Sequence, residues 1–121
     1  MDDNVFPAAH PSLDPEPAAM ALDPLHISGL LRKFHLKPQK SLGQNFLADH
    51  NALLKIVEDS GVGPEDRILE IGAGLGSLTR VLAVKAGSVV AVEIDAHLFP
   101  ALQSVTGQFD NIVKALINAF P

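Results

Sequence analysis

The feature that most constrains the fold is a glycine-rich turn between a strand pattern and a helix pattern. Gly72, Gly74 and Gly76 alternate along the chain directly after residues 67–71, which read RILEI. Glycine adopts left-handed backbone conformations at little cost, so this spacing lets the chain reverse within a few residues and lets a ligand approach bare backbone. The pattern predicts a strand–turn–helix unit with a ligand-binding turn.

The flanking segments extend this unit into an alternation of helices and strands. Residues 88–94 (SVVAVEI) are apolar nearly throughout, which suits a strand buried on both faces of a parallel sheet. Strands that alternate with helices predict the α/β class. We expect helices over 26–34, between the cap Asp49 and Gly61, over 77–86, and from 96 to about 105 with Asp95 as its cap. Residues 111–120 fit a helix by pattern, whereas their position after a second strand–helix unit favours a third strand.

Length and composition narrow the class of protein. The chain has 121 residues, which sets one domain as the upper limit, and it contains no cysteine, which excludes disulfides, Cys-ligated zinc and thiol catalysis. No apolar run could span a membrane, and the start of the chain lacks the basic residues of a secretory signal, so we expect a cytoplasmic protein with no membrane partner and no metal. Five of the nine prolines fall in residues 1–24. They predict a flexible acidic tail over 1–25, followed by the domain at 26–121.

The turn and the next strand together predict the chemistry of a ligand. A helix that begins near Gly76 points free N–H groups and a positive dipole at the turn, which favours an anionic group such as phosphate or carboxylate. Glu93 lies at the end of the next expected strand, where a carboxylate can accept hydrogen bonds from ribose hydroxyls. The spacing G-x-G-x-G differs from the dinucleotide fingerprint G-x-G-x-x-G. NAD and S-adenosylmethionine both remain open on this reasoning.

Basic residues gather in one short strip. Arg32, Lys33, Lys37 and Lys40 fall within nine residues, and no acidic residue occurs between Asp23 and Asp49. From charge alone, a solvated helix face is the simpler interpretation of such a strip. The other interpretation is a contact for phosphate groups, because clustered lysine and arginine attract polyanions.

Three segments carry a resemblance to a known family. Residues 40–47 (KSLGQNFL), 69–79 (LEIGAGLGSLT) and 92–95 (VEID) closely resemble the ribosomal RNA adenine dimethyltransferases. The glycine turn and Glu93 alone indicate only the wider class of S-adenosylmethionine-dependent methyltransferases, whereas the segment GQNFL is much more specific. The resemblance covers about two thirds of the chain, roughly 30–111. It implies a Rossmann-like methyltransferase fold with a parallel sheet.

The resemblance also implies an activity and the residues that serve it. Members of the family dimethylate N6 of two adjacent adenosines in small-subunit rRNA during ribosome biogenesis, with S-adenosylmethionine as cofactor. By position, the implied cofactor-binding residues are Gln44, Asn45, Leu47, Gly72, Gly74 and Glu93. RNA-methylating enzymes need cationic surface, so the resemblance favours RNA binding for Arg32, Lys33, Lys37 and Lys40. The implied partner is the rRNA of the immature small ribosomal subunit.

One departure from the family affects the expected activity. The family carries an N-(I/L)-P-Y motif that holds the target amine, and this sequence contains neither that motif nor any tyrosine. No catalytic residue is therefore assigned, and we expect an N-terminal part of such an enzyme that methylates no RNA alone. Two other interpretations stay open: a non-catalytic RNA-binding fragment, and a nicotinamide-dinucleotide-binding Rossmann enzyme.

Overall fold

The computed structural model describes residues 22–37 and 49–117, which form a small α/β unit. The elements in chain order are α2 (Ile27–Lys33), α3 (His50–Ser60), β1 (Arg67–Ile71), α4 (Ser77–Lys85), β2 (Ser88–Glu93), α5 (Phe99–Thr106) and β3 (Ile112–Leu116). The expected α/β class is therefore confirmed. The bounds of β1 agree with the prediction, and the segment that fitted either a helix or a strand contains β3.

The strands form a parallel sheet in the order β1-β2-β3. Leu69 of β1 pairs with Val90 of β2, which pairs with Val113 of β3. Each crossover contains a helix, as parallel neighbours require. The carboxyl ends of β1 and β2 therefore meet at one edge of the sheet, and the glycine turn begins at that edge.

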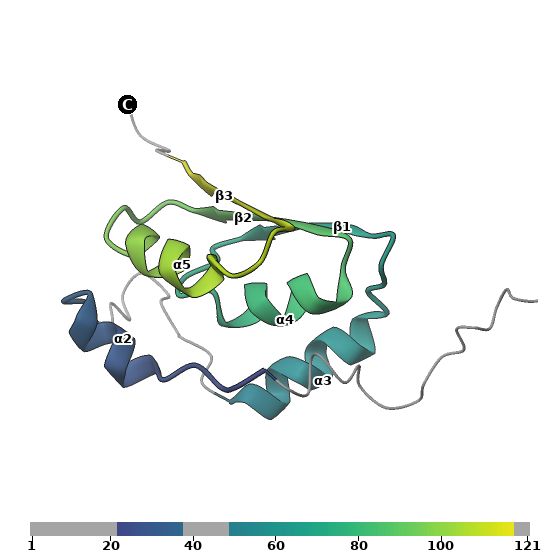
Figure 1. Ribbon diagram of the computed structural model, residues 1–121, viewed down its shortest axis with the longest axis horizontal. Coiled ribbons are helices and arrows are strands. Elements are labelled where there is room, and N and C mark those ends of the chain that lie inside the picture. Colours follow the sequence, from purple (N-terminus) through teal and green to yellow (C-terminus); the bar gives the residue numbers. More distant parts are fainter. Residues whose placement is uncertain (1–21, 38–48, 118–121) are drawn as a thin grey trace, which may run out of the picture.

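The helices lie on one side of the sheet, as Figure 1 shows for α2, α3, α4 and α5. The main core forms between this helical layer and the sheet, and its least exposed members include Val57, Val81, Val89, Ala91 and Leu102. The opposite face of the sheet has no helix over it in the described residues. Leu69, Val90 and Val113 are 65%, 37% and 61% exposed there. The expectation that β2 is buried on both faces is wrong for this face.

The helix ends follow the expected capping chemistry at α3 and depart from it at α5. The Asp49 carboxylate accepts a hydrogen bond from the Ala52 amide at 3.1 Å, and Gly61 ends α3 in a left-handed conformation. At α5 the expected start at residue 96 is wrong. Asp95 instead belongs to a turn, in which its carboxylate accepts from the His97 amide and its carbonyl accepts from the Leu98 amide. The helix begins at Phe99, because Pro100 has a fixed backbone angle that suits a first helical turn.

The segment before α2 contacts the helical layer. Leu22 packs against the main core, and the Arg80 guanidinium donates a hydrogen bond of 2.7 Å to the Asp23 carbonyl. The inner side of α2 joins a second apolar cluster with Leu75, Leu98 and Ala101. These contacts fix α2 beside α5, and they fix the segment before α2 beside α4. No helix in the described ranges is both long and apolar enough to cross a membrane.

Candidate functional site

The glycine turn lies at the carboxyl edge of the sheet and stays attached to β2. The amides of Gly72 and Ala73 both donate to the Val92 carbonyl, at 2.8 and 3.0 Å. Gly72, Gly74 and Gly76 have φ angles of +79°, +62° and +89°. These are left-handed conformations, so the structure explains the alternating glycines by backbone geometry.

Two glycines of this turn face different surroundings. A methyl group added at Gly72 would meet no heavy atom of residues 22–37 and 49–117 within 4 Å. At Gly76 the same methyl group would lie 3.1 Å from Leu102 Cδ1 and 3.2 Å from Val105 Cγ1. Gly76 therefore lets α4 and α5 pack closely, whereas the open side of Gly72 leaves room for a ligand to approach the backbone.

Glu93 is held against this turn by backbone donors. Its Oε1 accepts from the Gly74 amide at 2.7 Å, and its Oε2 accepts from the amides of Ile94 and Asp95 at 3.1 and 3.0 Å. The residue is only 5% exposed. Hydrogen bonds to an ionised acceptor are among the strong ones, so they fix the carboxylate firmly. A carboxylate offers about four acceptor positions, so Glu93 keeps capacity for a hydroxyl donor.

A second carboxylate lies close to Glu93. Glu70 of β1 precedes the turn, and its Oε1 accepts a hydrogen bond of 2.5 Å from the Thr79 hydroxyl. Burial raises the pKa of Glu70, the Thr79 hydrogen bond lowers it, and the charge of Glu93 raises it. Sequence reasoning did not select Glu70 or Thr79 for the site, although an acid two residues before Gly72 was a visible signal.

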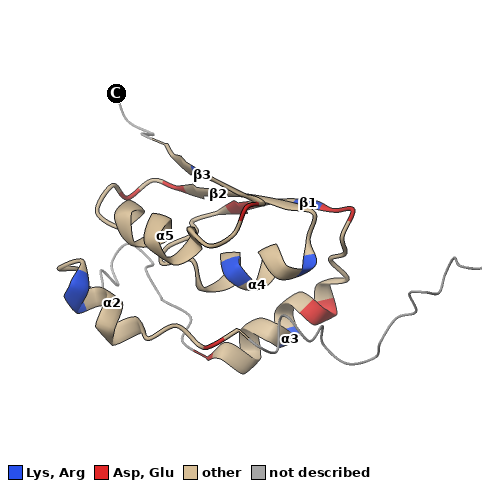
Figure 2. Ribbon diagram, viewed as in Figure 1, with Lys and Arg blue, Asp and Glu red and all other residues tan. Residues whose placement is uncertain are grey.

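The predicted cofactor residues fall into two groups. The structure brings Gly72, Gly74 and Glu93 together at the edge of the sheet. The remaining cofactor-binding candidates lie outside the described residues, as does one member of the cationic strip; they are Gln44, Asn45, Leu47 and Lys40. The other three members of that strip are exposed on α2 or just after it; they are Arg32, Lys33 and Lys37. Figure 2 shows the basic residues at the end of α2.

The chain is similar to known proteins over most of this unit. The family described as ribosomal RNA adenine dimethylase matches residues 35–115. A ribosomal RNA small subunit methyltransferase A from Moorella thermoacetica is 51% identical over 83 residues, which are 69% of this chain and 29% of that protein. The protein of the same name from Pediococcus pentosaceus is 46% identical and covers 74% of this chain and 30% of its own length.

Solved structures show the same fold. The 23S rRNA methyltransferase ErmE matches with a TM-score of 0.56 and 37% identity, covering 63% of this chain and 30% of that one. A dimethyladenosine transferase from Plasmodium falciparum matches with a TM-score of 0.55 and 26% identity, covering 64% of this chain and 30% of that one. The fold is the Rossmann-like methyltransferase fold that the resemblance implied. The chain spans about 30% of the length of the curated relatives described above.

Proposed function

The chain belongs to the ribosomal RNA adenine dimethylase family, and from this premise we propose that it binds S-adenosylmethionine and serves the N6-dimethylation of adenosines in small-subunit rRNA. The proposed substrate is the rRNA of the immature small ribosomal subunit, in the cytoplasm. The observation that carries the proposal is the Glu93 carboxylate fixed against the glycine turn.

The site fits an adenosine-type cofactor in two respects. Glu93 keeps an acceptor position at the end of β2, where it can receive a hydrogen bond from a ribose hydroxyl. The open side of Gly72 leaves space for the methionine end to lie against the backbone. Gln44, Asn45 and Leu47 are proposed to contact the cofactor from the segment 38–48. We propose that the domain comprises residues 26–121, against which Leu22 and Asp23 of the preceding segment pack.

The chemistry expected at this site depends on alignment. When bound, S-adenosylmethionine supplies a methyl group on a sulfonium with a neutral thioether as leaving group, so positioning contributes more than proton transfer. The protein residues named above bind the cofactor and orient its methyl group. Exposed Arg32, Lys33 and Lys37 are proposed to attract RNA phosphates, together with Lys40, and such attraction weakens as salt rises.

Calorimetric titration with S-adenosylmethionine tests the proposal on the 121-residue chain. Glu93→Ala and Glu93→Gln are expected to weaken binding by about 10- to 100-fold, because hydrogen bonds to a charged acceptor contribute roughly 1.5–3 kcal/mol. Glu65→Ala is the matched control, since Glu65 is an exposed acid in the turn before β1. Circular dichroism verifies that each variant is folded.

Two results would contradict the proposal. Unchanged binding heats in both folded Glu93 variants would remove the ribose assignment. Binding of NAD that S-adenosylmethionine fails to displace would favour the nicotinamide enzyme instead.

A further inference from the structure

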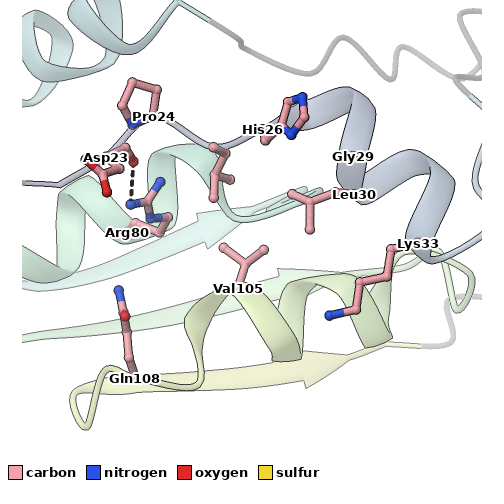
Figure 3. A pocket seen from close by; sticks show the side chains of 10 residues that line it. Asp23, Pro24, His26, Gly29, Leu30, Lys33, Arg80, Val105 and Gln108 are labelled. Carbon is pink, nitrogen blue, oxygen red and sulfur yellow. Dashed lines mark hydrogen bonds between the residues drawn. The ribbon is translucent and has the colours of Figure 1, made fainter.

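A cavity of about 370 Å³ lies on the side of the helical layer, apart from the glycine turn. Figure 3 shows it between α2 with its preceding segment and the helices α4 and α5. Its lining residues include Asp23, Leu30, Lys33, Arg80, Val105 and Gln108. None of them belongs to the turn 72–76, and Glu93 is not among them. The cavity is therefore a separate feature from the proposed cofactor site.

Arg80 gives this cavity a buried positive charge. The residue is 6% exposed, and its guanidinium donates one hydrogen bond of 2.7 Å, to the Asp23 carbonyl. No other hydrogen bond of the guanidinium is found among the described residues, although an arginine carries five N–H donors. Burial lowers the pKa of Arg80, and the nearby Asp23 carboxylate acts in the opposite direction. A buried guanidinium with spare donors is suited to an anionic ligand.

Lys33 and His26 add to the basic character of the lining. The Lys33 ammonium lies 5.4 Å from the centroid of the Phe34 ring, a cation–π contact, and Figure 3 shows the side chain reaching from α2 toward α5. The His26 ring lies against α2 at Gly29, where an added methyl group would come within 2.9 Å of His26 Nδ1. The absence of a side chain at Gly29 thus makes room for this ring.

The remaining lining residues fit a sugar or a base. Leu30 and Val105 provide apolar surface, whereas Asp23 and Gln108 provide hydrogen-bonding groups. The Asp23 carboxylate would repel a phosphate, but it can accept hydrogen bonds from a hydroxyl or an exocyclic amine. A volume of about 370 Å³ is at the lower end of the range for small-molecule sites, roughly 300–1,000 Å³, which suits a single nucleotide.

We propose that this cavity binds one ribonucleotide unit of an RNA strand, with phosphate near Lys33 or Arg80 and with sugar or base near Asp23 and Gln108. The inference rests on the proposed function, because it specifies where the RNA is held. It divides the cationic strip into two classes: Lys33 lines the cavity, whereas Arg32 does not. Phosphate contacts of this kind position the strand without reading its sequence.

The neighbouring basic residues of α2 provide a matched test. Fluorescence anisotropy with a labelled single-stranded RNA of about ten nucleotides measures binding to the 121-residue chain. Lys33→Glu is expected to weaken binding by about tenfold, and Arg32→Glu, the same charge change on the same helix, by only about twofold. Arg80→Gln is expected to weaken binding by at least about tenfold, and Arg80→Lys by less. Equal losses for Lys33→Glu and Arg32→Glu would overturn the cavity in favour of a general surface attraction.

Backbone amide chemical shifts locate the ligand and identify its source. Adenosine 5′-monophosphate is expected to shift the amides of Gly29 and Gln108, with at least about tenfold weaker affinity than the RNA strand. Equal affinity would overturn the RNA assignment in favour of a free mononucleotide. Shifts confined to Gly72 and Gly74 would place the nucleotide in the cofactor site and would overturn the proposal.

Parallel titrations with S-adenosylmethionine separate this inference from the proposed function. The Lys33→Glu variant is expected to bind the cofactor as the unaltered chain does. Loss of that binding would contradict the claim that the cavity is separate from the cofactor site. If Glu93 variants bind the cofactor normally while the difference between Lys33 and Arg32 persists, only the proposed function fails. Where Arg80→Gln does not fold by circular dichroism, the Lys33 and Arg32 pair decides the result.

Discussion

The two faces of the sheet differ in what covers them, although both are rich in apolar side chains. On the face toward the helices, Val89 and Ala91 of β2 are 0% exposed. On the other face, Leu69 and Ile71 of β1 are 65% and 71% exposed. Neighbouring valines of one strand, Val89 and Val90, thus have opposite surroundings. The comparison shows that apolar composition predicts a strand better than it predicts which face of that strand is covered.

The order of the strands explains the difference. The sheet runs β1-β2-β3, so both crossovers step in the same direction. Right-handed crossovers that step the same way place their helices on the same face. α4 and α5 accordingly lie together below the sheet in Figure 1. Helices reach the second face of such a sheet only when the chain steps in the other direction from β1, and the described residues contain no such step.

Exposed and less exposed side chains alternate along β1, and Glu70 lies on the covered face. Glu70 is more buried than its neighbours in the strand and accepts a hydrogen bond from Thr79 of α4, whereas Leu69 and Ile71 lie on the uncovered face. A half-exposed antiparallel strand shows the reverse pattern, with apolar residues toward the core and polar residues toward water. The covered face thus carries the chemistry of the site, and the uncovered face is apolar.

The largest expected effect comes from exchanging leucine for alanine on each face. Leu102→Ala removes a side chain that is 0% exposed and is expected to lower the free energy of unfolding by about 2–5 kcal/mol. Leu69→Ala removes the same atoms from the uncovered face and is expected to change it by no more than about 0.5 kcal/mol. Urea denaturation of the three chains measures both differences. Equal losses would show that Leu69 is covered in solution and that the two faces of the sheet do not differ in burial.

Two glycines of one turn, Gly72 and Gly76, differ in what surrounds them. Gly76→Ala and Gly72→Ala both place a side chain at a positive φ, which costs roughly 1–2 kcal/mol. Gly76→Ala also forces a methyl group against Leu102 and Val105, so its loss of stability is expected to be larger by about 1–3 kcal/mol. Gly72→Ala is expected to weaken S-adenosylmethionine binding more than it lowers stability. Thermal unfolding and calorimetric titration of both variants measure the two quantities, and a larger loss of stability in Gly72→Ala would refute this division of roles.

Local sequence signals predicted the parts of the structure that depend on backbone chemistry. The left-handed conformations of the glycine turn, the Asp49 cap and the bounds of β1 follow from residue types and their spacing. The sequence assigned Gly74 and Glu93 to one cofactor site, and the parallel pairing of β1 with β2 brings them together at one edge of the sheet.

Features that depend on distant packing were missed. The start of α5 depends on a competing turn at Asp95, and the uncovered face depends on the direction of the crossovers. Arg80 was not singled out by the sequence analysis, yet it is buried and donates to the Asp23 carbonyl, 57 residues away in the sequence. No periodicity within α4 carries that information, because the partner comes from another part of the chain.

The smallest expected effect concerns the buried carboxylate of β1. Because the pKa of Glu70 is raised in the folded protein, mainly by burial, the folded state binds this proton more tightly than the unfolded state does. The group therefore contributes stability that is fully present below its ordinary pKa of 4.5 and is lost as the pH rises through the raised value.

Glu70→Gln removes this dependence and keeps an oxygen that can accept the Thr79 hydrogen bond. The free energy of unfolding of the Glu70→Gln variant minus that of the unaltered chain is expected to be larger at pH 7 than at pH 4. The change in this difference between the two pH values is expected to be smaller than the loss for Leu102→Ala. Urea denaturation at both pH values measures the difference, and the same exchange at exposed Glu65 is the matched control. If the Glu70→Gln variant gained more stability at pH 4 than at pH 7, the Thr79 hydrogen bond would outweigh burial in setting the pKa of Glu70. The covered face would then hold Glu70 as a stabilised charge.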